Sequence, residues 1–278
     1  AWRGLRGVRS GGGGFPAASR DPARPGRSDA APDLNLSYWQ SATVNKDGTK
    51  VLVSDGWGGG GQPKCRSVDR NEWGADAIFT IADGKMQFQN YYKMPAAQTA
   101  QENCAAHNGN LVPIPGRDVM VQAWYQGGIS VFDWTDPRHP KEIAFFDRGP
   151  VDSTRMAMGG SWSAYWYNGP IVTSAIARGL AIFALLPSTY LSRNEIDAAN
   201  SVHFDYYNAQ GQPRVVWPPS FSLARAYVDQ LERSNGLTTA RIASVRQTLA
   251  NAENLSGARR VDILSQLATQ LDTDVSGS

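Results

Sequence analysis

Apolar residues recur along the middle of the chain in a repeated order. Three short apolar runs end in phenylalanine, at Phe79, Phe132 and Phe183, and the steps between these phenylalanines are 53 and 51 residues. Another apolar run ends eleven residues before the second and the third phenylalanine, at residues 119–121 and 171–172. The first unit has its matching run at residues 51–53, with an insertion before Phe79, and Val44 and Val112 end still earlier runs.

Turn residues follow the repeated phenylalanines. The first unit has Ala-Asp-Gly at residues 82–84, the second has Thr-Asp-Pro at 135–137, and a further apolar run follows at 86–92 and 142–146. Four short strands in a unit of about 50 residues are typical of one blade of a β-propeller. A β-sandwich would also give short strands, but not the same strand order at a near-constant period. The pattern therefore predicts a mainly β fold.

The repeat predicts only part of a propeller ring. About three four-stranded blades can be counted, at residues 38–94, 105–147 and 160–186, whereas a closed propeller needs at least four. We therefore expect an incomplete β-propeller over residues 34–218, the C-terminal part of a larger one, with the remaining blades upstream. Residues 200–217, with Asn-Ala-Gln-Gly at the centre, predict one more hairpin that completes the last blade.

The pattern changes to helical spacing near the C-terminus. Ser192 and Glu195 form a capping box for a short helix at residues 192–200. Beyond Pro218, residues 219–278 predict a small α-helical extension of three amphipathic helices, whose apolar stripes form their buried face or, alternatively, an oligomerisation or docking surface. The stripes are Leu223, Tyr227 and Leu231, then Ile242, Val245 and Leu249, then Leu264, Leu267 and Leu271.

Charge is unevenly distributed along the 278 residues. Residues 1–33 hold seven Gly, four Pro and six Arg against three Asp, which leaves about −1 of the net charge of +2 for the rest of the chain. We expect residues 1–33 to be disordered, with an arm that grips phosphate or anionic lipid as the alternative. The absence of a basic excess elsewhere argues against nucleic-acid binding. No apolar stretch of about 18 residues predicts a membrane span.

The two cysteines, Cys65 and Cys104, are 39 positions apart. A disulfide between them would stabilise the fold by roughly 4 kcal/mol in the chain-entropy treatment and would indicate an oxidising compartment. The alternative is a metal or redox site, because Cys104 and His107 form a C-x-x-H pattern. That pattern supplies only two of the four ligands of a structural zinc site.

Motifs for catalysis and cofactor binding are missing from the sequence. Residues 159–163 (GGSWS) approach the nucleophile pattern G-x-S-x-G but lack its last glycine. No phosphate-binding loop, dinucleotide-binding fingerprint, H-E-x-x-H or calcium loop is present. We therefore predict no cofactor, no metal site and no catalytic residue, and favour a protein that is not an enzyme.

One histidine and several aromatic residues are the candidates for ligand binding. His107, followed by Asn108, opens the first strand of the second predicted blade, and such strands line the central channel of a propeller. Its alternative is a hydrogen-bonded structural histidine. Trp124, Tyr125 and Trp162 fall near strand ends, where their rings could stack on sugars or peptides; packing between blades is the alternative.

Residues 128–137 (GISVFDWTDP) and 140–144 (PKEIA) resemble the bacterial LVIVD-repeat proteins. The resemblance covers roughly residues 37–235 and implies a secreted or cell-surface bacterial protein with a propeller fold. Two features depart from it, namely Ala184 in place of the repeated Asp, and residues 1–33. No catalytic residue transfers from the family. The positions that also resemble it are Cys104, His107, Asn108, Trp124 and Tyr125.

These features lead to two functional hypotheses. The first is a non-enzymatic binding or scaffold propeller outside the cytoplasm, which engages an unidentified protein, peptide or saccharide through the channel mouth around His107. The second is a hydrolase or metal-dependent enzyme with a site on the propeller axis, where His107 and Asp55 would be ligands.

Overall fold

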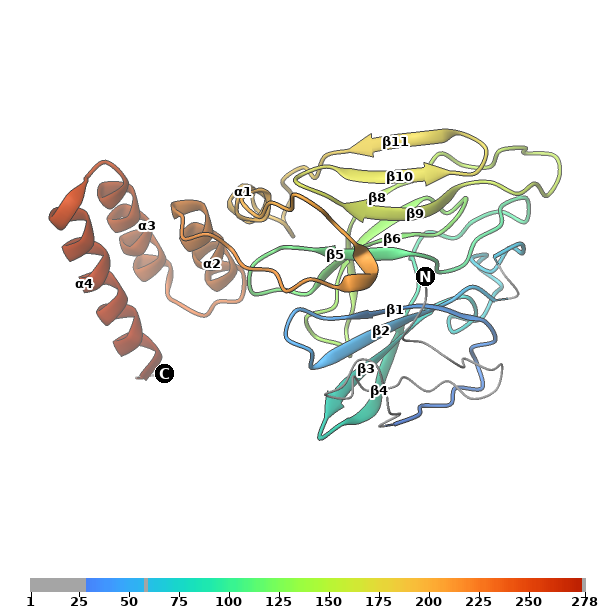
Figure 1. Ribbon diagram of the computed structural model, residues 1–278, viewed down its shortest axis with the longest axis horizontal. Helices are drawn as coiled ribbons and strands as arrows, with labels where there is room; N and C mark the ends of the chain where they lie inside the picture. The colour runs from blue at the N-terminus through green and yellow to red at the C-terminus, as the bar shows by residue number, and fades with distance from the viewer. Residues whose placement is uncertain (1–28, 58–59, 277–278) are drawn as a thin grey trace. The chain divides into compact units, whose positions relative to one another are not determined.

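A computed structural model describes residues 29–57 and 60–276 of the chain (Figure 1). Its fold is mainly β, with three antiparallel sheets and four α-helices in the described residues. Contacts divide the chain into two compact units, one with all three sheets and residues 203–215, the other with the helices. Most of the predicted disorder at residues 1–33 lies outside the described residues.

The first two sheets each have four strands in sequence order, as the repeat predicts. Phe79 and Phe132 lie in the third strand of their sheets, and Val44 and Val112 end the first strands. The strands of the first sheet are β1 (Trp39–Val44), β2 (Lys50–Asp55), β3 (Asp76–Ala82) and β4 (Lys85–Tyr92), and those of the second are β5 (Gly109–Val112), β6 (Val119–Ala123), β7 (Ile129–Asp133) and β8 (Lys141–Phe146).

Successive side chains along a strand point to opposite faces of its sheet, and apolar residues occur on both faces. Leu52 and Ile78 of the first sheet belong to a buried cluster with Phe132 of the second, and the rings of Tyr92 and Phe132 stack with their centroids 3.8 Å apart. Burying each such side chain contributes about 1.5–3 kcal/mol. The second sheet therefore packs on one face of the first, and Figure 1 shows it between the first and the third.

The third sheet has three strands in the order β11-β10-β9. The ring of Phe183 lies 4.4 Å from that of Phe146 in the second sheet, and the backbones of Tyr125 and Ser161 bond to each other in both directions, at 3.0 and 2.7 Å. These contacts join the third sheet to the second. Its strands are β9 (Ser161–Trp166), β10 (Ile171–Ala175) and β11 (Gly179–Phe183).

The predicted hairpin at residues 200–217 is wrong. After α1, this part of the chain forms one short 3₁₀ turn, Ala209–Gly211, and no strand. Gln212 has a positive φ of 42° and its side chain, not a strand ladder, bonds to the backbone of β1, accepting from the Val44 amide at 2.6 Å. Side-chain anchoring of this kind leaves the segment irregular, and it adds no fourth strand to the third sheet.

The helical predictions are confirmed. Ser192 and Glu195 form the capping box of the first helix. Val228, Ile242 and Leu249 share one buried core, with Leu231, Leu264 and Leu271 packed against it. The second and third predicted stripes thus belong to the buried faces of the helices. In the first stripe, Leu223 is not part of this core and Tyr227 is 43% exposed. The helices are α1 (Arg193–Asn200), α2 (Phe221–Arg233), α3 (Thr239–Glu253) and α4 (Gly257–Ser276).

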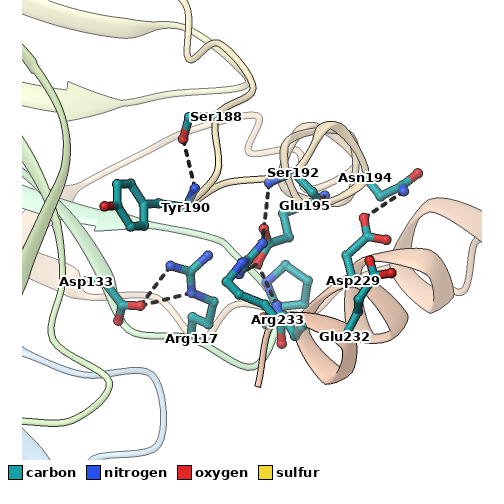
Figure 2. Close-up of polar contacts among 12 residues, drawn as sticks. Arg117, Asp133, Ser188, Tyr190, Ser192, Asn194, Glu195, Asp229, Glu232 and Arg233 are labelled. Carbon is teal, nitrogen blue, oxygen red and sulfur yellow. Dashed lines mark hydrogen bonds and ion pairs between the residues drawn. The ribbon is translucent and has the colours of Figure 1, made fainter. Parts of the chain in front are cut away.

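Glu195 is the central polar residue of the helical unit, and Figure 2 shows it between Ser192 and Arg233. Its fully buried carboxylate accepts from the Ser192 amide at 2.7 Å, from Gln230 Nε2 at 3.0 Å and from Arg233 at 2.6 and 3.2 Å. A buried carboxylate needs such partners, because an uncompensated charge is costly in a low dielectric. Glu195 thereby ties α1 to α2.

The predicted disulfide is present between Cys65 and Cys104. Cys104 is fully buried and belongs to the cluster between the first and second sheets, beside Met94 and Trp124. The bridge therefore ties the insertion of the first sheet to the segment that leads into β5. The metal alternative loses Cys104 as a thiolate ligand, because both sulfur atoms are used in the bridge.

Candidate functional site

His107 lies just before β5, with its ring 4.8 Å from that of Tyr125. Its Nδ1 bonds to the backbone carbonyl of Trp162 in β9. Since a carbonyl only accepts, Nδ1 carries the proton, and burial lowers the pKa of the ring. The neutral ring therefore keeps a lone pair on Nε2, which has no hydrogen-bond partner among the described residues.

The predicted aromatic site is mostly closed. Tyr125 is 2% exposed, and a side chain on Gly60 would meet its ring at 2.1 Å, so the backbone at Gly60 lies close against the ring. Trp162 is 51% exposed, and its ring centroid lies 6.1 Å from that of His107. Among the predicted residues, the structure brings His107, Tyr125 and Trp162 together, and only Trp162 offers a large accessible surface.

Trp124 and Asn108 have structural contacts. Trp124 is fully buried between the first and second sheets and packs edge-on to Tyr92, with centroids 6.0 Å apart. The Asn108 carbonyl accepts from the amides of Ala123, at 3.1 Å, and Ala164, at 3.3 Å. Trp124 therefore packs between the sheets, which is the alternative to ligand stacking. Asn108 joins the second and third sheets through its backbone.

Asp55 does not join His107 as a metal ligand. Its Oδ1 accepts from the backbone amides of Tyr38 at 2.6 Å, Ser37 at 3.2 Å and Trp57 at 3.3 Å, while burial raises the pKa of its carboxyl group. In residues 29–57 and 60–276, no three His, Cys, Asp or Glu side chains gather in a way that could hold a metal ion.

A cavity of about 540 Å³ lies at the ends of β1, β5 and β9 that are opposite to the His107 site. Its walls come from the turn between β1 and β2, from β5, from the end of β9 and from residues 203–215. This volume is in the range of pockets that hold small organic ligands. The lining includes Thr43, Val44, Asn45, Lys46, Asp47, Gly109, Asn110, Leu111, Pro113, Trp166, Phe204, Tyr207, Gln212 and Arg214.

Side-chain contacts hold residues 203–215 over the cavity. Tyr207 accepts from Asn110 Nδ2 through its hydroxyl, and burial raises the pKa of that hydroxyl. Phe204 packs edge-on to Trp166, with centroids 6.5 Å apart, and its amide donates to Asn168 Oδ1 at 2.8 Å. The cover therefore brings two half-buried rings, Phe204 and Tyr207, to the cavity wall.

The cavity wall carries donors and acceptors, among them the cations Lys46 and Arg214 and the carboxylate Asp47. The indole N–H of Trp166 is buried and has no acceptor in the described structure, and an unpaired buried donor costs about 1–3 kcal/mol. Arg214 is exposed and forms no ion pair or hydrogen bond with the described residues. Lys46 instead donates to the Arg117 carbonyl, and burial lowers its pKa to about 8.

Sequence reasoning missed this cavity for a physical reason. Its wall combines Asn45, Asn110, Trp166 and Tyr207, which come from four distant parts of the chain. No spacing rule links them, and the segment over the cavity lies within residues 200–217, for which the sequence predicts a hairpin. The one available signal was the cluster of Phe204, Tyr206 and Tyr207 in a segment with little regular periodicity.

Comparison with models of known protein families finds no match. Comparison with curated proteins finds no match either. No helix in the described ranges is long and apolar enough to cross a bilayer.

Proposed function

We propose that the chain is a binding protein of an extracytoplasmic compartment, built from consecutive blades of a β-propeller, with its ligand in the 540 Å³ cavity. The strand order repeated in three sheets supports the propeller. The buried disulfide supports an oxidising compartment. The resemblance of residues 128–144 to LVIVD repeats fits the same assignment.

The cavity lining supports an acidic saccharide as the ligand class. Phe204 and Tyr207 offer apolar ring faces, against which a sugar ring packs. Trp166 belongs to the same wall. Arg214, which has no ion-pair or hydrogen-bond partner among the described residues, adds an exposed guanidinium to the lining, and guanidinium groups bind carboxylates through charge-assisted hydrogen bonds. A cavity of this size, walled by two half-buried aromatic rings and with the Arg214 guanidinium among its lining residues, is the observation that carries the proposal.

Calorimetric titration of the full chain with a uronic acid disaccharide tests this function. We expect saturable binding that the matched neutral hexose disaccharide reproduces with lower affinity. Arg214→Gln should weaken binding of the acidic sugar by about tenfold, since it removes one charge-assisted contact, and should leave the neutral sugar unaffected. Trp162→Ala, at the end of β9 away from the cavity, is the control that should change neither affinity.

A second variant separates cavity filling from loss of charge. Ala209→Trp places a large ring on the wall contributed by residues 203–215 and should abolish binding while the far-ultraviolet circular dichroism stays native. Absence of binding by both sugars in the wild type, or equal binding in Ala209→Trp, would overturn the proposed site.

A further inference from the structure

The third sheet has one strand fewer than the other two. In the first and second sheets, the strand that carries the repeated phenylalanine pairs on both sides, β3 with β2 and β4, and β7 with β6 and β8. β11 pairs with β10 alone, and no other strand of the described chain lies along its second side. Within residues 29–57 and 60–276, that side of β11 is therefore a free sheet edge.

The backbone groups on this edge follow from the register. Alternate residues of an antiparallel strand bond to its two neighbours. In the second sheet, the Trp134 amide donates to the Asp118 carbonyl beside β6. The even-numbered residues of β7 therefore bond toward β6, and odd-numbered residues such as Val131 bond toward β8. Val131 is aligned with Ile182 of β11. By the same alternation, the N–H and C=O groups of Leu180 and Ile182 point away from β10.

The side chains at the same positions are also uncovered. Leu180 is 67% exposed and Ile182 is 63% exposed, whereas the aligned residues of the second sheet, Ile129 and Val131, are each 3% exposed. The second sheet buries these positions on the face opposite to Phe132, which is the face turned toward the third sheet. The third sheet thus presents an apolar face of the kind that its neighbour buries.

The first sheet has no matching open face. Its outer residues Val51, Val53 and Phe79 are 3%, 1% and 2% exposed, because Leu36 and the residues around it cover them. A second copy of the chain therefore has no open first-sheet face to pack against β11. An added strand with apolar side chains at alternate positions would fit both the bare edge and the bare face.

We propose that β11 binds an extended segment of a partner protein as an antiparallel fourth strand. Backbone hydrogen bonds to Leu180 and Ile182 provide affinity, and apolar side chains at alternate positions of the partner cover the two exposed side chains. The fourth strand of the second sheet, β8, shows the chemistry required: Ile143 is 9% exposed and its strand pairs with β7 over five residues. This surface is separate from the cavity and does not depend on it.

Hydrogen exchange tests the strand. The probe is a synthetic peptide that copies residues 140–148 (PKEIAFFDR), added to the full-length, isotope-labelled chain. We expect the amides of Leu180 and Ile182 to exchange at least about tenfold more slowly with peptide, as paired amides do. A control peptide with proline in place of Ile143 and Phe145 should have no effect.

Two variants and one concentration series complete the experiment. Ile182→Pro removes an edge donor and should abolish the peptide's effect on Leu180, whereas Phe145→Ser, at an exposed residue of β8, should preserve it. Exchange that the peptide leaves unchanged in the wild type would overturn the proposal. Protection that rises with protein concentration without peptide would overturn it as well, because a second copy would then be the occupant.

Discussion

The Nε2 of Gln122 in β6 donates to Oδ1 of Asp76 in β3 at 2.7 Å, and both side chains are fully buried between the first and second sheets. Burial raises the pKa of the Asp76 carboxyl group well above its usual value, with the nearby Asp55 carboxylate raising it further. A buried acid thus sits in the contact that joins two sheets, where its ionisation opposes folding.

This contact predicts a pH-dependent stability. The folded pKa of Asp76 exceeds the unfolded one, so the folded state binds a proton more tightly and stability falls as the pH rises above about 4. Asp76→Asn keeps an acceptor oxygen without the charge. We expect its free energy of unfolding, relative to the wild type, to increase between pH 4 and pH 8 in urea titrations. An unchanged difference across that range would contradict the assignment.

The disulfide predicts a large effect of reduction. Cys65 and Cys104 close a loop with a sequence separation of 39 residues, and removing this cross-link should lower the free energy of unfolding by roughly 4 kcal/mol. Urea unfolding of the oxidised protein and of the Cys65→Ser/Cys104→Ser double variant measures the difference. Equal midpoints would show that the bridge adds nothing to stability.

The backbone conformation and surroundings of Gly160 predict that this position tolerates no side chain. It has a φ of +82°, and a Cβ there would lie 1.9 Å from the carbonyl carbon of Tyr125, where the second and third sheets bond. Gly160→Ala should destabilise by about 3 kcal/mol or more. Gly48 is the matched control, with a φ of +80° and no atom within 4 Å of its Cβ position. Gly48→Ala should cost about 1 kcal/mol. Similar costs for both, measured by thermal unfolding, would rule out the close approach at Gly160.

We expect two ion pairs of the helical unit to contribute unequally to the free energy of unfolding. Arg233→Ala leaves the buried Glu195 without its cation and should cost about 2 kcal/mol, since the arginine is partly exposed. Arg193→Ala removes a solvent-facing pair with Asp197 and should cost less than about 0.5 kcal/mol. Thermal unfolding followed at 222 nm compares them. Equal costs would show that burial of Glu195 does not decide the effect.

Local patterns predicted much of the fold. The repeated phenylalanines place β3, β7 and β11, because a period of two and short turns determine strands locally, and Ser192 with Glu195 places the start of α1 for the same reason. The hairpin predicted at residues 200–217 is wrong, since Gln212 bonds to β1 residues about 170 positions away. The burial of Trp124 also depends on distant partners, so the sequence could not distinguish it from the exposed Trp162.

The most direct measurement of the central claim is the indole N–H resonance of Trp166 in the labelled full chain, assigned with Trp166→Phe. Adding the uronic acid disaccharide should shift this resonance, because Trp166 lines the cavity, while the Trp162 resonance stays in place. A Trp166 resonance that stays unchanged at saturating sugar, or a shift confined to Trp162, would contradict a ligand site in the cavity.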